Sequence, residues 1–353
     1  MDKRKKLLIL NRSQFGYHID SFQYCKYLRH YFDITYLGWD YGKPYLKLDG
    51  VKVYYVNRSL GKIKRYINFI SECVRQCRVL QNIVFIKYFP LCSIVKLLAK
   101  KNNYIVDIRT GFLVKNPIML SLMNTFLSWE VKLFENITII SSSLAKKLVL
   151  NKREPKVIPL GADVNSEEDK SFNELRLLYI GTFHLRNLEQ TILGFSKYYK
   201  ENKSKINMNY VIIGSGYNQE EEKYEALIKK EGLEKIITLV GPVYHEDLKA
   251  YFDSQNIGVS FIPMTSYFDC QPSTKTFEYL LSGMPVIATA THESTLVVND
   301  SNGVLINDTA DSFCEGLKKM ENSRETYNSE RIRTTSKQVG PTRYKYGRCS
   351  QKY

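Results

Sequence analysis

The chain has 353 residues, of which 44% are hydrophobic and 13% aromatic, which is enough for about two packed domains and excludes wholesale disorder. Lysine and arginine number 51 against 36 aspartate and glutamate, so the net charge is +15. The N-terminal sequence MDKRKKLLILN has only a four-residue apolar run, and no apolar stretch reaches the ~20 residues that span a bilayer. We therefore expect a cytoplasmic chain without a secretory signal.

The excess positive charge lies in the first half of the chain. Residues 1–160 are strongly basic, residues 161–330 are acidic overall, and residues 331–353 are basic again. This asymmetry predicts two domains with different partners. It is also compatible with nucleic-acid binding, but no recognition motif accompanies the charge, and we expect no nucleic-acid partner.

The seven cysteines are odd in number and scattered, a pattern typical of reduced thiols. Cys73 and Cys77 lie four residues apart and would share one face of a helix, where they either pack or form half of a metal site. No second pair of cysteines or histidines has ligand spacing. We therefore expect no bound metal.

Buried strands alternate with helices along the first half of the chain. The pattern predicts strands at 6–10, 33–37, 51–56, 83–86, 104–108, 138–141 and 156–159, and helices at 20–30, 61–80 and 92–101. After the polar segment 165–174, the alternation resumes with strands at 175–181, 208–214, 235–241, 257–263 and 285–289, and helices from 188 and at 220–231, 246–252 and 273–282.

Strands separated by helices of this length form parallel sheets with right-handed crossovers. We predict an α/β chain with a doubly wound domain at 1–164 and a second at 165–330. The remaining residues, 331–353, form a basic tail. Its end, 339–353, contains glycine, proline and few aliphatic residues, so we expect a truncated or disordered segment.

The segment PSTKTFEYLLSGMPVIAT (272–289) predicts a short helix followed by a returning strand. Ser273 or Thr274 can cap the first turn, and Gly283 supplies the left-handed residue that ends the helix. Glu278 falls at the edge of the buried helix face, where a carboxylate needs a partner.

Glycines directly follow strands of the second half, at Gly181 and at Gly214 with Gly216. Ligands of parallel sheets collect at the carboxyl ends of the strands, where glycine lets backbone amides approach a phosphate. Each glycine alone is equally consistent with a turn. The nearby cations Arg186 and Lys275 favour a diphosphate, although either one could be a solvated residue at a helix end.

The blocks VIPLGAD (157–163), LLYIGT (177–182), VIIGSG (211–216) and ITLVGPV (237–243), with the run at 272–289, resemble the retaining family 4 glycosyltransferases, also called glycosyl transferases group 1. FEYLLSGMPVIA is the most specific of these motifs. The resemblance implies the GT-B fold, in which two Rossmann-like doubly wound parallel-sheet domains face a central cleft. The N-terminal domain would then bind the acceptor and the C-terminal domain the nucleotide sugar.

The resemblance assigns roles to the second-half residues. Glu278 would bind the ribose hydroxyls, since a carboxylate can accept two hydrogen bonds from a vicinal diol. Arg186 and Lys275 would hold the donor diphosphate and stabilise its charge during transfer. The remaining donor-side residues are Gly181, Thr182, Gly214, Gly216, Asp269, Cys270, Ser273 and Thr274.

The sequence departs from the family at two positions of the second half. Many members carry a second glutamate eight residues before the ribose-binding one, close to the donor sugar. Here that position is Cys270, and its neighbour Asp269 is the alternative sugar contact. Thr182 stands where an arginine often follows the glycine, which leaves Arg186 as the phosphate cation.

A further departure lies in the first half. The His-Asp element of the family is replaced by DIRTG (107–111). We predict that Asp107 and Arg109 join Arg186 and Lys275 in catalysis by contacting the donor sugar or the acceptor, or else that they close a loop. Gly16 and His18, in the first loop, are the acceptor-side candidates, with a structural role as the alternative for the histidine.

The implied reaction is transfer of a sugar from a nucleotide-sugar donor to a saccharide or lipid-linked acceptor hydroxyl, with retention of configuration and without a metal. Such a transferase would serve cell-surface or capsular polysaccharide or glycolipid biosynthesis. A sugar-nucleotide 2-epimerase of the same architecture and a catalytically degenerate nucleotide-sugar binder are the alternatives.

The apolar run PIMLSLMNTFLSW (117–129) lies within the basic first half. Together they favour a face that approaches the anionic inner leaflet of the plasma membrane. The alternative is a core helix in a domain whose charge serves solubility.

Overall fold

The computed structural model divides the chain into two compact units, one ending at Pro159 and the other starting at Leu160. The sequence placed this boundary five residues later, at 164. The structure describes residues 4–79, 83–112, 114, 116–150, 154–202, 206–216, 219–244 and 247–339.

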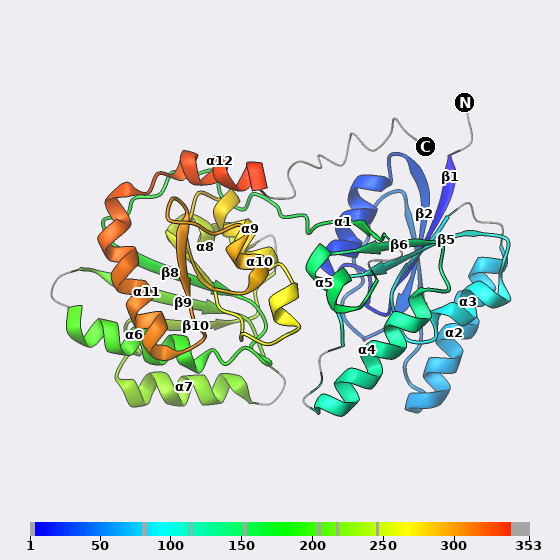
Figure 1. Ribbon diagram of the computed structural model, residues 1–353, viewed down its shortest axis with the longest axis horizontal. Coiled ribbons are helices and arrows are strands. Elements are labelled where there is room, and N and C mark those ends of the chain that lie inside the picture. Colours follow the sequence, from blue (N-terminus) through cyan, green and yellow to red (C-terminus); the bar gives the residue numbers. More distant parts are fainter. Residues whose placement is uncertain are drawn as a thin grey trace. The chain divides into compact units, whose positions relative to one another are not determined.

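The first unit is built on a seven-stranded parallel sheet with the order β3-β2-β1-β4-β5-β6-β7 (Figure 1). Its strands are β1 (Lys5–Leu10), β2 (Phe32–Trp39), β3 (Val51–Val56), β4 (Ile83–Lys87), β5 (Asn103–Ile108), β6 (Asn136–Ile139) and β7 (Lys156–Val157). Its helices are α1 (Ile19–Leu28), α2 (Lys62–Arg78), α3 (Cys92–Leu98), α4 (Pro117–Val131) and α5 (Ser142–Lys147).

The second unit has a six-stranded parallel sheet with the order β10-β9-β8-β11-β12-β13. Its strands are β8 (Leu175–Ile180), β9 (Met208–Ile213), β10 (Ile237–Gly241), β11 (Ile257–Ser260), β12 (Val286–Thr289) and β13 (Gly303–Ile306). Its main helices are α6 (Glu189–Asn202), α7 (Glu220–Glu231), α8 (Leu248–Ser254), α9 (Thr274–Leu281), α10 (His292–Thr295), α11 (Ala310–Ser323) and α12 (Ser329–Val339), with short 3-10 helices at Phe268–Cys270 and Arg324–Thr326.

Both sheets confirm the predicted doubly wound α/β class. In each unit the strand order reverses at the first strand, β1 or β8, which lies in the interior of its sheet. The interior strands are buried on both faces because helices cover both sides, and this is why they read as continuous apolar runs. The side chains of β11 and β12 illustrate this, since all eight of their residues are buried.

The last part of the second unit was not resolved by the sequence patterns. Strand β13 and helix α11 had no predicted counterpart, and residues 331–339 of the expected basic tail belong to α12, which packs on α9. Ser329 donates its hydroxyl to the carbonyl of Gly283, and the buried Ile332 anchors the helix. The rest of the predicted tail, 340–353, lies outside the described residues.

The segment 272–289 folds as a short helix, a tight turn and a strand, as predicted. Gly283 has a φ of +74°, and a Cβ there would lie 2.8 Å from the Cβ of Ser329. Only glycine fits, both for the left-handed turn and for the close approach of α12. The predicted cap is absent, because Ser273 occupies the N-cap of α9 without bonding to its first-turn amides.

All six described cysteines are buried and unpaired by disulfides. Burial raises the pKa of Cys25 and of Cys77 to about 12. Among the described residues, no three His, Cys, Asp or Glu side chains are grouped as a metal site would require. Within the same residues, no helix has the length and apolar character needed to cross a bilayer.

Candidate donor-binding site

The predicted donor residues meet at the carboxyl ends of β8, β9 and β11 in the second unit. Gly181 directly follows β8 and Gly214 directly follows β9. The two turns touch, because a Cβ at Gly214, whose φ is +148°, would lie 1.8 Å from the carbonyl oxygen of Gly181. A side chain at Gly214 would therefore separate the two strand ends.

The amide of Gly216 is already used within the chain. It donates to Oε1 of Glu221 at 2.8 Å, and α7 begins there with three consecutive glutamates. This acidic first turn complements the helix dipole and repels an anion. Of the predicted glycines, Gly181 and Gly214 rather than Gly216 lie away from fixed negative charge.

Thr182 holds the turn after β8 in place. Its carbonyl accepts a hydrogen bond from the Tyr179 hydroxyl at 2.8 Å, and its own hydroxyl accepts from the backbone amide of His184 at 3.3 Å. The turn continues through Phe183, whose amide donates to Ser215 in the turn after β9. These bonds fix the backbone that carries Arg186.

Arg186 is a partly buried cation without a carboxylate partner in the described part of the chain. Its guanidinium lies 4.7 Å from the centre of the Phe268 ring, and its buried Nη1 has no hydrogen-bond partner. Burial lowers the pKa of Arg186, although a guanidinium stays charged at any physiological pH. A buried donor of this kind needs an acceptor, and an anionic ligand would supply one.

Glu278 is buried, with 1% of its surface exposed. Its Oε2 lies 2.5 Å from Nζ of Lys275, one turn earlier on α9. The partner that the sequence required for this carboxylate is therefore Lys275. Of the two side chains, only Lys275, 25% exposed, reaches water.

The N-terminus of α9 lies next to this ion pair and carries no acidic residue in its first turn. Ser273 accepts a hydrogen bond from the Ser260 hydroxyl at 3.1 Å, and Thr276 donates to Ser260 at 2.7 Å. The hydroxyls thus bind one another at the end of β11 instead of capping the helix. Thr274, the first residue of α9, begins a turn whose amides and dipole favour an anion.

Asp269 and Cys270 belong to the short 3-10 helix before α9. Asp269 accepts a hydrogen bond from the backbone amide of His292 at 2.7 Å, which ties this segment to α10. Cys270 is 9% exposed and its thiol lies 3.6 Å from the carbonyl of Ser266. Asp269 is therefore hydrogen-bonded inside the domain, and its role at the donor sugar stays a prediction.

Asp107 and Arg109 lie in the first unit and are largely enclosed. Asp107 accepts from the Thr138 hydroxyl at 2.6 Å, and its second oxygen lies 3.7 Å from Nε of Arg109. Arg109 also donates to Asp20 at 3.1 Å and to the carbonyl of Ile158 at 2.6 Å. Burial raises the pKa of Asp107, and the adjacent Arg109 opposes that shift.

His18 extends this cluster. Its Nε2 contacts Nζ of Lys87, and its Nδ1 lies 3.3 Å from the Ser21 hydroxyl. Burial and the nearby lysine lower the pKa of His18 to about 4, and burial lowers that of Lys87 to about 8. The histidine is therefore neutral at pH 7. Gly16, the other acceptor-side candidate, has a φ of +87° and packs against Leu46.

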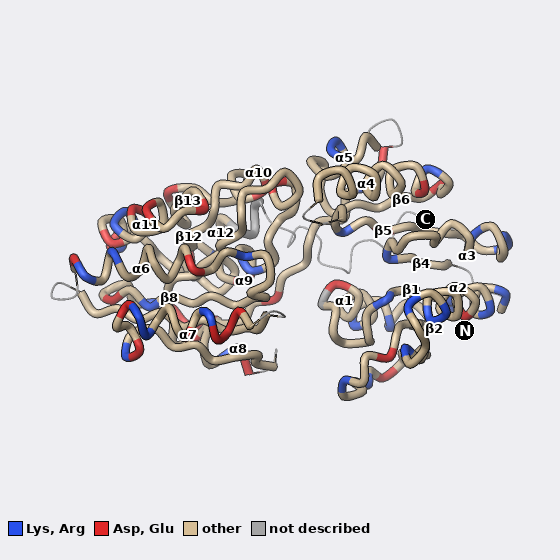
Figure 2. The backbone as a smooth tube through the Cα atoms, turned by 90° about the horizontal axis from the view of Figure 1, so that it is seen from below, with Lys and Arg blue, Asp and Glu red and all other residues tan. Residues whose placement is uncertain are grey.

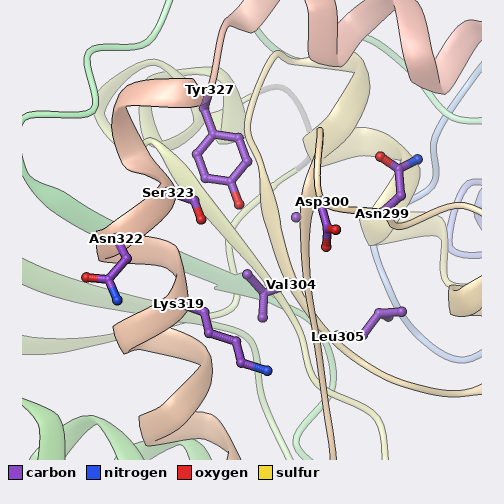
Figure 3. Close-up of a pocket in the computed structure, with 9 residues that line it drawn as sticks. Asn299, Asp300, Val304, Leu305, Lys319, Asn322, Ser323 and Tyr327 are labelled. Atoms are coloured by element: carbon purple, nitrogen blue, oxygen red, sulfur yellow. The ribbon is translucent and has the colours of Figure 1, made fainter.

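The structure also shows a cavity of about 330 Å³ between β13 and α11 (Figure 3). Asp300, Lys319 and Tyr327 line it among others, and Asn299 and Asp300 place it at the amino end of β13. Ligands of parallel sheets gather at the opposite, carboxyl ends. The cavity contains none of the predicted site residues.

Sequence reasoning missed Phe268, Ser260, Asp20 and Lys87. The first two contact Arg186 and the start of α9, and the last two hold Arg109 and His18. A positional signal existed for Ser260 and Lys87, since each is the last residue of its strand. The ring under Arg186 had no such signal.

Comparison with known proteins identifies a family model that matches part of the second unit. Residues 174–322, which contain the whole strand-end site, match the family model described as Glycosyl transferases group 1. A search of curated proteins gives no significant match.

Solved structures share the fold over nearly the whole chain. Sucrose-phosphate synthase from Thermosynechococcus elongatus is 14% identical with a TM-score of 0.76, covering 95% of both chains. Anabaena HepE in complex with UDP-glucose is 13% identical with a TM-score of 0.70, covering 96% of both. A trehalose-6-phosphate structure from E. coli bound with UDP-2-fluoro glucose is 9% identical with a TM-score of 0.68, covering 96% of this chain and 97% of the other. The chain therefore has the GT-B fold.

Proposed function

We propose that this protein is a glycosyltransferase that moves a sugar from a nucleotide-sugar donor to an acceptor hydroxyl with retention of configuration. The observation that carries the proposal is Arg186, a partly buried guanidinium without a carboxylate partner in the described chain, which lies after β8 and against the ring of Phe268. The match of residues 174–322 to group 1 glycosyl transferases supports it. The neighbours solved with UDP-glucose and UDP-2-fluoro glucose make uridine nucleotide sugars the first donors to test.

In the proposed reaction, the donor diphosphate accepts hydrogen bonds from Arg186 and from the first-turn amides of α9, with Lys275 beside them. As the bond between the sugar and the diphosphate breaks, negative charge grows on the leaving oxygen, and these fixed donors stabilise it. The acceptor hydroxyl attacks on the face that the diphosphate leaves, and the diphosphate takes its proton. Glu278 binds the ribose of the nucleotide.

Arg186→Gln tests the diphosphate contact. We expect a tenfold or greater loss of affinity for the nucleoside diphosphate and little loss for the bare nucleoside, measured by calorimetric titration. Arg331→Gln is a matched control. It removes the same charge as Arg186→Gln, but from an exposed position on α12 of the same unit. Equal affinity in wild type and Arg186→Gln would contradict the proposed diphosphate site.

The reaction itself is tested by incubating the wild-type protein with a panel of nucleotide sugars, with and without saccharide and lipid-linked acceptors. Product that forms only with an acceptor supports transfer, whereas a changed donor sugar without acceptor would identify a 2-epimerase. Binding without any turnover would identify the degenerate binder. Nuclear magnetic resonance of the new anomeric centre reports retention, and added EDTA should leave the rate unchanged if no metal takes part.

We further propose that the acceptor is presented at an anionic membrane surface, as in cell-surface or capsular polysaccharide or glycolipid synthesis. Helix α4 supports this, because one of its faces is apolar and exposed. Ile118 is 71% exposed, Leu122 62% and Trp129 59%. The alternative reading of this segment as a core helix fits only its other face, where Leu127 and Val131 are buried.

Basic side chains accompany this surface in the first unit. Helix α2 carries five lysines and arginines against one glutamate (Figure 2). It packs on α3, which Ser93 ties to Glu130 at the end of α4. An apolar face near excess positive charge is typical of surfaces that bind anionic lipid.

A further inference from the structure

Three arginines of the first unit gather around one tryptophan. The guanidinium carbons of Arg12, Arg58 and Arg65 lie 4.8, 5.3 and 5.9 Å from the ring centre of Trp39. Arg58 also lies 3.8 Å from the ring centre of Tyr41. An aromatic face attracts each cation, but the cations repel one another, so the group is a concentration of positive charge.

The four residues lie where three neighbouring strands of the sheet end and where helix α2 begins. Arg12 follows β1, Trp39 is the last residue of β2, Arg58 follows β3, and Arg65 lies in the first turns of α2. Carboxyl ends of parallel strands are where such sheets bind ligands. The N-terminus of α2, a 17-residue helix, adds unbonded amides, since Gly61 at its N-cap offers no side-chain acceptor and its first turn has no acid.

The cluster is rich in buried hydrogen-bond donors. Three buried nitrogen atoms have no hydrogen-bond partner: Nε of Arg12, Nε of Arg58 and Nε1 of Trp39. Water does not readily reach the indole, because Trp39 is only 3% exposed. In the described part of the chain, none of the three arginines pairs with a carboxylate. Arg109, in the same domain, has two.

The acid next to Trp39 in the sequence does not neutralise the cluster. Asp40 follows Trp39 directly, but its carboxylate accepts from the amide of Gly42 at 2.8 Å and from the Tyr45 hydroxyl at 2.6 Å. The hydrogen bonds from Tyr45 and Gly42 lower the pKa of this exposed carboxylate. The three guanidinium groups thus keep an uncompensated charge.

The surrounding frame fixes the cluster in place. Trp39 packs against the buried Phe69, with ring centres 5.1 Å apart. Gln14, 1% exposed, accepts from the amide of Tyr41 at 2.9 Å and donates to the carbonyl of Lys43 at 2.6 Å, which joins the loops after β1 and β2. Fixed donors of this kind bind an oxyanion with little loss of side-chain freedom.

We propose that Arg12, Arg58, Arg65 and Trp39 form a binding site for the phosphate group of the acceptor. Three cations match a multiply charged phosphate or diphosphate better than a single carboxylate, and the planar guanidinium forks suit its oxygens. The assignment to the acceptor rests on the proposed glycosyl transfer, whereas phosphate binding itself does not. A phosphorylated saccharide and a lipid-linked phosphate share this chemistry.

Trp39 reports directly on the site. The chain has two tryptophans, so Trp129→Phe leaves Trp39 as the only indole emitter. We expect inorganic phosphate and pyrophosphate to change Trp39 fluorescence saturably in this background. Adding Arg58→Gln and Arg65→Gln should weaken pyrophosphate binding at least tenfold, and rising salt should weaken it further.

Two matched variants separate this site from other effects. Arg78→Gln removes one positive charge from an exposed position at the far end of α2, and it should leave the titration unchanged. Arg186→Gln should also leave it unchanged, because that residue belongs to the second unit. A signal lost in Arg186→Gln, an affinity unaltered by the Arg58 and Arg65 changes, or no saturable signal at all would overturn the proposal. Circular dichroism melts verify that each variant is folded.

Competition then distinguishes the two sources of phosphate. If hexose phosphate displaces pyrophosphate at a lower concentration than farnesyl phosphate does, the acceptor is a soluble sugar phosphate. If farnesyl phosphate is the stronger competitor, the acceptor is lipid-linked. Displacement by an uncharged hexose as strong as by hexose phosphate would contradict a phosphate site. Failure of sugar transfer with intact pyrophosphate binding would instead remove the proposed reaction and leave the anion site standing.

Discussion

Glu278 and Lys275 bind each other at 2.5 Å, so a nucleotide has to share or replace a contact that already exists. The lysine satisfies the buried carboxylate while the ribose is absent, which spares the fold an unpaired charge. A ribose diol can then compete for the carboxylate oxygens, and the lysine can turn toward a phosphate. In the proposed complex, Glu278 would contact the ribose and Lys275 the diphosphate, so the two partners of this ion pair would bind the two halves of the nucleotide.

Glu278→Gln is expected to lower nucleotide affinity by roughly 1.5–3 kcal/mol, about ten- to a hundredfold, because the amide keeps the shape but loses the charge and one acceptor. Lys275→Ala should weaken a nucleoside diphosphate but spare the nucleoside. It should also lower the melting temperature, since it strands the buried Glu278. Calorimetric titration beside thermal melts measures both, and unchanged affinity in Glu278→Gln would remove Glu278 from the site.

His18 predicts a pH effect on stability. Its pKa is about 4 in the folded chain against an ordinary 6.5, so the folded state favours the neutral ring. The stability from this preference is present above pH 6.5 and is lost as the pH falls toward 4. Between these values the wild type should lose up to about 3 kcal/mol more than His18→Gln, which cannot titrate. Urea unfolding of both across this range tests it, and parallel curves would contradict the shift.

At the scale of single residues, the sequence predicted those site residues that lie within a local motif. Glu278 and Lys275 were predictable because the segment 272–289 encodes the short helix that carries them, and Arg186 because it closely follows the turn after β8. The ion pair from Arg109 to Asp20 could not be predicted, since 89 residues separate its partners. Nor could the burial of Glu278, which depends on the packing of α9 against the rest of the domain.

At the scale of elements, the strands from β1 to β12 were predicted because continuous apolar runs mark them, whereas the four-residue β13 was missed. Helix α12 was missed because only Ile332 and Val339 in SERIRTTSKQV are aliphatic, so its amphipathic pattern is faint. Its place is set instead by tertiary contacts, such as that of Arg333 with Asp169 at 2.8 Å. For α4, the sequence indicated an apolar helix but not which of its faces would be covered.

The exposed face of α4 is expected to drive binding to anionic vesicles. Replacing Leu122 and Trp129 by glutamine should reduce sedimentation with phosphatidylglycerol vesicles several-fold, because apolar area at the interface is lost. Leu296→Gln, which alters a 55% exposed leucine of the second unit, is the control. Rising salt should weaken binding as well. Equal pelleting on neutral and anionic vesicles would contradict the electrostatic contribution.

At the scale of the whole molecule, the division into two units separates the proposed roles. Every donor-side residue lies beyond Leu160, and the arginine cluster lies before Pro159. The second unit has its own continuous core, which includes Phe195, Tyr210 and Leu280. The charge asymmetry in the sequence follows the same division, although it did not locate the boundary to the residue.

Residues 160–339 expressed alone are therefore expected to fold and to bind the nucleoside diphosphate within about tenfold of the full chain, since a compact unit with its own core folds independently. Calorimetry and a thermal melt of this fragment test the expectation. The same fragment should transfer no sugar, because the proposed acceptor site is missing. A folded fragment without nucleotide affinity would show that the first unit supplies donor contacts.

The labelling rates of the buried cysteines can report how often each unit opens. Only a thiolate attacks an alkylating reagent. Burial keeps the six described thiols unreactive while the fold is closed, and the raised pKa values of Cys25 and Cys77 add to this protection. In a Cys349→Ser background, labelling at Cys25, Cys73, Cys77 and Cys92 would time the opening of the first unit, and labelling at Cys270 and Cys314 that of the second. A ligand that slows the labelling of the cysteines in one unit but not in the other stabilises the first of these units.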